Sequence, residues 1–191
     1  MDTADTSACA GSGAAADPAW PDPGAADAAL SVASLYQTHS VALIKLAMIM
    51  LGDRAAAEDV VQDAFIGLYR HWYRLADPAN ALPYVRSSVL NGCRLALRQR
   101  ARRERRDRAA SSGTSAVAAS AESLVLLSEE HREVLAAVWR LPNRQREALV
   151  LRFYFGLSEE ETARAMGVSR GTVKSAMSRA RAALRMLRGE P

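Results

Sequence analysis

The sequence predicts an all-α fold in which two small helical domains are joined by a flexible linker. Aromatic residues make up only 6% of the 191 positions, and Leu, Val, Ala and Met supply most of the apolar content. That mixture favours helices over sheets. Apolar residues recur at helical spacing on both sides of an Ala- and Ser-rich stretch at 109–121. The length suits one or two domains, each with a modest core.

Residues 1–27 are rich in Ala, Gly, Pro and Asp, carry only acidic charges, and are predicted to be a disordered tail. They lack the basic start and apolar centre of a signal peptide, and no apolar run has membrane-spanning length. We therefore expect a cytoplasmic protein with no membrane insertion. Cys9 and Cys93 form no CxxC motif, which indicates a reducing compartment. The three histidines lie far apart, so neither a metal site nor a cofactor is expected.

The first two helices are predicted at about 28–51, where Gly52 ends the helix, and at about 54–73. The second has one apolar stripe and an opposite face that is acidic. By default such a face is a solvated helix surface. It could instead dock on an arginine-rich partner helix through bidentate ion pairs. The face consists of Glu58, Asp59, Gln62 and Asp63.

Two X-Pro pairs break the chain before a third helix, predicted at about 82–106. Its first half mixes aromatic, amide and arginine side chains, a combination that suits single-stranded nucleic acid. An asparagine inside a helix has poor propensity, which favours a polar task for Asn91. The alternative for the aromatic ring of Tyr84 is a place in the core. The candidate contacts are Tyr84, Arg86, Ser87, Asn91, Arg94 and Arg98.

The second half of this helix is strongly basic. Seven arginines lie between positions 98 and 108, against two acidic residues, although the net charge of the whole chain is only +4. Such a run would bind phosphates without regard to sequence. A solvated helix end favoured by the helix dipole is the alternative. Because seven like charges repel one another, we favour nucleic acid as the partner.

The second domain is predicted to contain helices at about 122–140, 143–155, 158–166 and 169–187. Ser158 and Glu161 have the spacing of a capping box, Gly167 supplies the positive φ of a tight turn, and Ser169 can cap the last helix. The last helix has an apolar face and a separate basic face. The pattern is typical of a helix-turn-helix whose second helix enters the DNA major groove. An ordinary αα-hairpin with a solvated basic face is the alternative. The apolar face consists of Val173, Met177, Ala180 and Leu184.

Taken in order, four motifs resemble an extracytoplasmic-function (ECF, group IV) sigma factor of the sigma-70 family. They are Ala57-Glu-Asp-Val-Val-Gln-Asp-Ala-Phe65, Tyr84-Val-Arg to Asn91 with the arginines that follow, Leu141-Pro to the Gly156-Leu-Ser-Glu-Glu-Glu-Thr-Ala segment, and Gly167-Val-Ser-Arg-Gly-Thr-Val-Lys-Ser175. The resemblance covers residues 30–106 and 124–188.

The resemblance implies a region 2 domain at 28–106, a linker at 107–122 and a region 4 domain at 123–188. Region 2 would grip core RNA polymerase at the β′ clamp helices and open the promoter −10 element. Asn91 would capture a flipped −10 base, and Arg94, Arg98 and the later arginines would hold phosphate. Region 4 would contact the polymerase β flap and read the −35 element through Ser169, Arg170, Thr172, Lys174, Ser175 and Arg179. An anti-sigma factor is a further implied partner.

Two rival functions stay open on the sequence alone. A stand-alone helix-turn-helix regulator would bind duplex DNA without polymerase, but it leaves the acidic helix and the Asn91 segment unexplained. A helical enzyme acting on nucleic acid would need clustered carboxylates, a metal site or an activated nucleophile, and the chain offers none of these. We therefore predict a non-enzymatic initiation factor.

Overall fold

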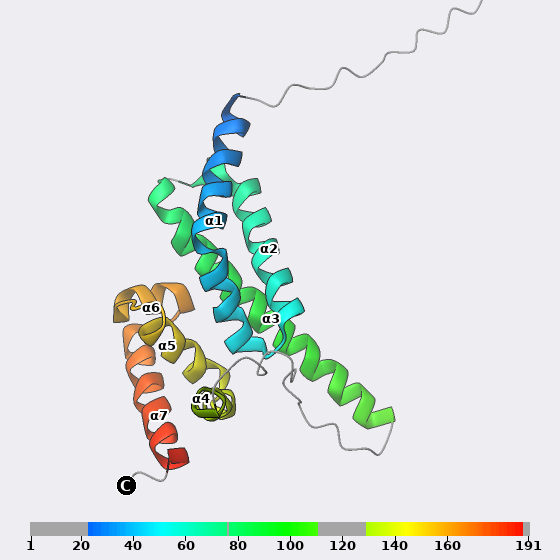
Figure 1. The fold of residues 1–191 in the computed structure, drawn as a ribbon, viewed down its shortest axis with the longest axis vertical. Coiled ribbons are helices and arrows are strands. Elements are labelled where there is room, and N and C mark those ends of the chain that lie inside the picture. The colour runs from blue at the N-terminus through cyan, green and yellow to red at the C-terminus, as the bar shows by residue number, and fades with distance from the viewer. Residues whose placement is uncertain (1–22, 76, 111–128, 189–191) are drawn as a thin grey trace, which may run out of the picture.

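The computed structural model describes residues 23–75, 77–110 and 129–188, and every regular element in these ranges is helical. The helices are α1 Pro23–Leu51, α2 Arg54–His71, α3 Ala81–Ala110, α4 Glu129–Arg140, α5 Asn143–Phe153, α6 Glu159–Met166 and α7 Arg170–Arg188. Two short 3-10 turns, η1 Trp72–Arg74 and η2 Pro78–Asn80, lie between α2 and α3. The predicted all-α fold is confirmed, and α1–α3 form one bundle beside a second bundle of α4–α7 (Figure 1).

The first bundle is built on the apolar stripes that the sequence predicts. Helices α1, α2 and α3 pack against one another around a fully buried core. The Asp53 carboxylate accepts a hydrogen bond from the Ala56 amide at 3.1 Å and so caps the start of α2. The core is made of Leu43, Leu46, Met50, Val61, Phe65, Leu68, Val85, Val89 and Leu90.

In the second bundle, α7 packs against α5 and α6, and α4 lies across it. The apolar face predicted for the last helix is the one that turns inward, since Val173, Met177 and Ala180 are buried and Leu184 is partly buried. Burying this face leaves the basic side of α7 toward solvent. The remaining core residues are Leu141, Ala148, Leu151, Leu157 and Met166.

The two bundles touch each other, which the sequence did not predict. The Trp139 indole on α4 donates a hydrogen bond to the Ile49 carbonyl of α1 at 2.9 Å. Arg146 on α5 donates one to the Met50 carbonyl at 2.8 Å. The middle of α3 packs against α6. The second bundle is therefore docked on the C-terminal end of α1 and on the middle of α3.

Three predicted boundaries differ from the structure. Helix α1 begins at Pro23, inside the predicted 1–27 tail, because proline is well tolerated in the first turn of a helix. Helix α2 ends at His71, and the chain tightens there into η1. Helix α3 continues through residues 107–110, which were predicted to be linker. Residues 1–22 lie outside the described residues. So do residues 111–128, which hold the rest of the predicted linker and the start of the predicted region 4 domain.

One helix in the described ranges, Asp27–Leu51, is long and apolar enough to cross a membrane by length and composition alone. The sequence-based statement that no apolar run has that length was therefore wrong. Helix α1 uses this apolar character in the core, where Leu43, Leu46 and Met50 are fully buried. A core helix passes the same test of length and composition.

Candidate nucleic-acid interface

The predicted single-strand contacts lie on α3, but they are not equally accessible. Asn91 and Arg98 are exposed, whereas Tyr84, Arg86, Ser87 and Arg94 are half-buried. Positions 84, 87, 91, 94 and 98 recur at intervals of three or four, so these side chains share one face of the helix. The structure thus brings the predicted residues together and also covers part of their surface.

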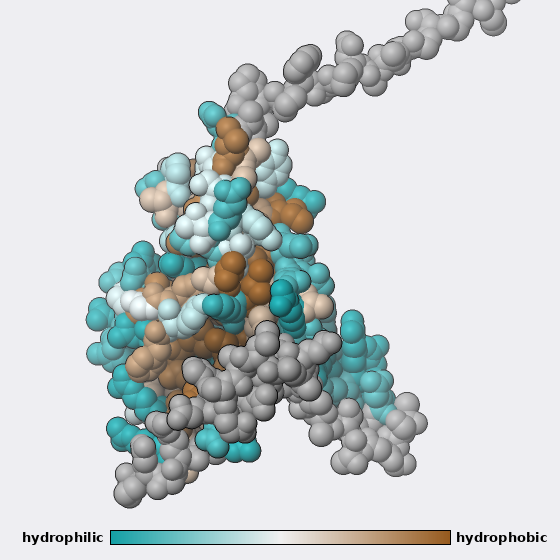
Figure 2. Space-filling view, in the orientation of Figure 1, coloured by the Kyte–Doolittle hydropathy of each residue, from teal (hydrophilic) through white to brown (hydrophobic). Residues whose placement is uncertain are grey.

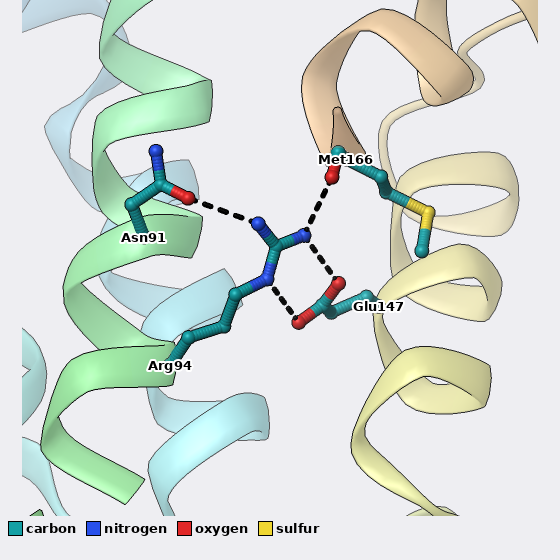
Figure 3. A network of polar contacts seen from close by, with 4 residues as sticks. All are labelled: Asn91, Arg94, Glu147 and Met166. Atoms are coloured by element: carbon teal, nitrogen blue, oxygen red, sulfur yellow. Dashed lines mark hydrogen bonds and ion pairs between the residues drawn. The ribbon is translucent and has the colours of Figure 1, made fainter. Parts of the chain in front are cut away.

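Arg94 is at the centre of a polar network that crosses between the bundles (Figure 3). Its Nε and Nη2 donate to the two carboxylate oxygens of Glu147 at 2.8 and 2.6 Å. Nη2 also donates to the Met166 carbonyl at 3.0 Å, and Nη1 donates to the Asn91 Oδ1 at 2.9 Å. These hydrogen bonds to Glu147 raise the pKa of the Arg94 guanidinium. The predicted phosphate ligand is therefore engaged inside the protein.

The orientation of the Asn91 amide follows from the same network. A guanidinium has only donors, so the atom of Asn91 that faces Arg94 must be the amide oxygen. The Asn91 nitrogen, which can donate two hydrogen bonds, points away from Arg94 (Figure 3). Asn91 is an exposed residue of α3, so its amide group is accessible to a ligand.

Arg86 lines a cleft of about 380 Å³ between α3 and α6. Its guanidinium stacks over the Phe155 ring at 5.3 Å, and its Nε has no hydrogen-bond partner among the described residues. Burial lowers the pKa of Arg86, while the nearby Glu161 carboxylate opposes that shift. Tyr84 and Ser87 line the same cleft. Like Arg94, Arg86 is held between the bundles.

The basic end of α3 is open by comparison. It projects past α1 and α2 as a hydrophilic rod (Figures 1 and 2). Arg100 pairs with Glu104 at 3.2 Å within the helix. The exposed arginines here are Arg98, Arg102, Arg103, Arg105 and Arg106. Such a surface suits polyanion binding, since the phosphate contribution depends on charge and not on base sequence.

The acidic face of α2 points to solvent, as predicted. Asp59, Gln62 and Asp63 are exposed, and Glu58 forms an ion pair with Arg54 at 2.7 Å. An apolar groove lies between α1 and α2, close to this acidic face, with Ile66 and Tyr69 on its α2 side. Its other lining residues are Ala29, Val32, Ala33, Tyr36, Gln37 and Phe65. The face therefore combines carboxylates with exposed apolar surface.

Helices α6 and α7 have the cap and turn geometry of a helix-turn-helix. Both hydrogen bonds of the Ser158–Glu161 capping box are present, and they lower the pKa of the exposed Glu161 carboxyl. Gly167 has φ +65°, and the Ser169 hydroxyl accepts the Thr172 amide at 3.2 Å. These three predictions are confirmed.

The predicted −35 contacts lie along the outer side of α7. Ser169, Arg170, Lys174 and Arg179 are exposed, and Thr172 and Ser175 are partly exposed. Lys174 is 3.7 Å from Glu159 in a mostly exposed pair, which contributes little to stability. The four exposed side chains are thus accessible to a large ligand such as duplex DNA.

Sequence reasoning missed Arg146 and Glu147, two adjacent charged residues on α5 that are 8% and 1% exposed. Arg146 donates to the carbonyls of Val138, Trp139 and Leu141 as well as to that of Met50. Burial lowers the pKa of Arg146. The signal in the sequence was weak, because both charges belong to the polar first half of α5, directly before the apolar run 148–151, and their partners are distant in the sequence.

Comparison with known proteins agrees with this arrangement. The family model for sigma-70 region 2 matches residues 35–103, and that for sigma-70 region 4 matches residues 131–184. An ECF RNA polymerase sigma factor, SigM of Mycobacterium tuberculosis, is 32% identical over 81% of this chain and 76% of its own length. The chain belongs to the sigma-70 family. It is an ECF RNA polymerase sigma factor with region 2 on α1–α3 and region 4 on α4–α7.

Two further similarities support the assignment. A probable RNA polymerase sigma factor, RfaY of Xanthomonas campestris, is 33% identical over 73% of this sigma factor, which spans 36% of the length of RfaY. The sigma factor RpoE of Bartonella quintana, solved in complex with the anti-sigma factor NepR, superposes with a TM-score of 0.63 at 25% identity. That match covers 82% of this chain and 97% of RpoE. The described residues contain no cluster of three or more His, Cys, Asp or Glu that could hold a metal.

Proposed function

We propose that this sigma factor selects promoters through two contacts on separate domains. Region 2, at 28–106, would capture a −10 base and hold the melted strand, and region 4, at 123–188, would read the −35 duplex. Residues 1–27 and 107–122 would be the tail and the linker. The observation that carries the proposal is an exposed asparagine, Asn91, on the same face of α3 as Arg94 and Arg98, with a run of further arginines after them on the helix.

The −10 contact would use Asn91 for recognition and arginines for affinity. Extruding a base from the duplex costs a few kcal/mol, which contacts to the base edge and stacking must offset. Asn91 is exposed, and only its oxygen is engaged by Arg94, which supports a role at a base edge. Arg94, Arg98 and the later arginines would hold the backbone phosphates. Tyr84, Arg86 and Ser87 would line the same path.

The −35 contact would place α7 in the major groove. Bidentate contacts to base edges give about 1–3 kcal/mol of discrimination each, and phosphate contacts add affinity without sequence preference. The exposure of Arg170, Lys174 and Arg179 on α7 supports this role. Ser169, Thr172 and Ser175 would contribute hydroxyl groups to bases or phosphates.

Docking on core polymerase would use the acidic face of α2 against the β′ clamp helices, with region 4 on the β flap. Asp59, Gln62 and Asp63 are exposed, and within the described parts of the chain neither carboxylate forms an ion pair, so they are accessible to arginines of a partner. Glu58 would join them by giving up its ion pair with the exposed Arg54 and pairing with an arginine of the polymerase. Polymerase would then hold two weak DNA contacts at high effective concentration, which makes them act together.

Three further properties complete the proposal. The chain would act in the cytoplasm as an initiation factor without catalytic activity of its own. Its relatives of known structure include a sigma factor bound to an anti-sigma factor, which supports an anti-sigma factor as a partner here too. No cofactor is needed for the proposed function.

Run-off transcription with core polymerase and a responsive promoter tests the −10 assignment. We expect Asn91→Ala to lower the transcript yield by about fivefold to a hundredfold, because one lost base contact is worth about 1–3 kcal/mol. Gln99→Ala, which removes another exposed amide from α3, should leave the yield within twofold of the original. Equal yields from Asn91→Ala and Gln99→Ala would refute the role of Asn91. Failure of the chain to bind core polymerase would favour a stand-alone regulator.

A further inference from the structure

The contacts that close region 4 onto region 2 use the groups proposed to meet promoter DNA. Arg94 spends Nε, Nη1 and Nη2 on Glu147, Asn91 and Met166. All three guanidinium nitrogens are therefore engaged within the protein. One N–H of Nη1 stays free, so a DNA phosphate could take the paired Nε and Nη2 donors of Arg94 only by displacing Glu147.

Glu147 has the chemistry of a phosphate substitute. Its two carboxylate oxygens take the paired guanidinium donors in the same fork geometry that a phosphate accepts. The Glu147 side chain is only 1% exposed, while that of Arg94 is 25% exposed, so the pair closes at the seam between the bundles. Both oxygens of Glu147 face Arg94 across this seam (Figure 3).

The closed arrangement has further attachments away from this pair. The hydrogen bonds of Trp139 and Arg146 to carbonyls at the end of α1 tie region 4 to a second place on region 2. Arg86 is covered at a third place by Phe155. A displacement of region 4 that exposes Arg94 must break contacts at all three places.

We infer that region 4 covers the −10 surface of region 2 in the isolated sigma factor, with the Glu147 carboxylate occupying the phosphate position at Arg94. Single-stranded nucleic acid and region 4 then compete for one surface. The inference rests on the proposed function of α3. Its quantitative consequence is that the observed affinity for single strands equals the intrinsic affinity multiplied by the fraction of open molecules.

Binding of a single strand without promoter sequence tests the inference, because competition for a phosphate does not depend on base sequence. The probe is fluorescein-labelled dT20, measured by anisotropy at low salt with the full chain. Glu147→Gln leaves Arg94 without its anion in the closed form, and removing one partner of such an ion pair disfavours the arrangement that contains it. We expect dT20 to bind about tenfold more tightly. The radius of gyration from X-ray scattering should rise in the same variant.

Two companion variants keep the test decisive. Glu133→Gln removes the same charge from an exposed site on α4 and should change the Kd by less than twofold. Trp139→Phe keeps an aromatic ring but removes the hydrogen bond to Ile49 of α1, and it should also tighten dT20 binding. Circular dichroism at 222 nm checks that each variant is folded.

The inference is overturned if Glu147→Gln and Trp139→Phe both bind dT20 like the original chain, or if Glu133→Gln tightens binding as much as Glu147→Gln. Neither measurement uses polymerase or a promoter. A failure here is therefore distinct from a failure of the Asn91 assignment, which is read from transcript yield.

Discussion

Arg146 is the buried charge whose removal should be most costly to this fold. Its guanidinium donates to four carbonyls: those of Val138 at 3.2 Å, Trp139 at 2.6 Å, Leu141 at 3.2 Å and Met50 at 2.8 Å. Three of them belong to the end of α4 and the turn after it, and of these the Val138 carbonyl also accepts the Leu141 amide at 3.1 Å. Arg146 therefore joins α5 to α4 and also to region 2.

Replacing Arg146 by methionine keeps an unbranched apolar stem and removes every donor. A hydrogen bond to a charged group contributes about 1.5–3 kcal/mol, and each buried acceptor left without a partner costs about 1–3 kcal/mol. These contributions do not add fully, and water reaches some of the freed carbonyls. We expect Arg146→Met to lower the free energy of unfolding by about 2–4 kcal/mol.

Urea denaturation followed by circular dichroism at 222 nm measures the effect. With a slope of about 1–3 kcal/mol/M, the expected loss moves the midpoint down by about 1–2 M. Arg144→Met is the matched control, since Arg144 lies exposed on the same helix and its loss should cost less than about 0.5 kcal/mol. If Arg146→Met shifts the midpoint no further than Arg144→Met does, the carbonyl contacts do not stabilise the fold and this reasoning is wrong.

Two other predictions concern neighbouring residues of α3: Gly92, which packs against α2, and the buried Cys93. A Cβ added at Gly92 would lie 2.7 Å from the Val60 Cγ1, so Gly92→Ala should destabilise region 2 by about 1–3 kcal/mol. Adding Val60→Ala should restore part of that loss in urea titrations, and simple additivity of the two substitutions would count against a clash. Burial raises the pKa of Cys93 to about 12, so in a Cys9→Ser variant the folded chain should react with a thiol reagent at pH 8 only after urea is added. Because the pKa of Cys93 is higher in the folded chain, its contribution to the free energy of unfolding is fully present below the thiol pKa of the unfolded chain, about 8.5, and is lost as pH rises toward 12. Rapid labelling of native Cys93 would contradict both statements.

Local signals in the sequence predicted most of the fold. Apolar spacing gave the helices and the inward faces of α2 and α7, because a helix that packs on a core must bury one stripe. The Ser158–Glu161 cap and the turn at Gly167 depend on residues only a few positions apart. The end of α3 was harder to predict, since nothing after Arg106 forbids a helix and i,i+4 pairs such as Arg100 with Glu104 support one.

The seam between the bundles could not be predicted in this way. Arg94 and Glu147 are 53 positions apart, and Trp139 and Ile49 are 90 apart. A pattern argument assigns Glu147 to a solvated face, because an isolated buried carboxylate is costly. Arg94, the cation that pairs with Glu147, is brought next to it only by the tertiary fold. The sequence thus pointed to the residues of the α3 surface but not to their occupation by region 4.

As a sigma factor, this chain should give core polymerase its choice of start site. Transcription of genomic fragments in vitro measures that choice, with core polymerase free of other sigma factors and with mapping of the 5′ ends. We expect a small set of start sites that appears only when the chain is added and is lost with Asn91→Ala. Transcripts that begin at the same scattered positions with and without the chain would contradict it.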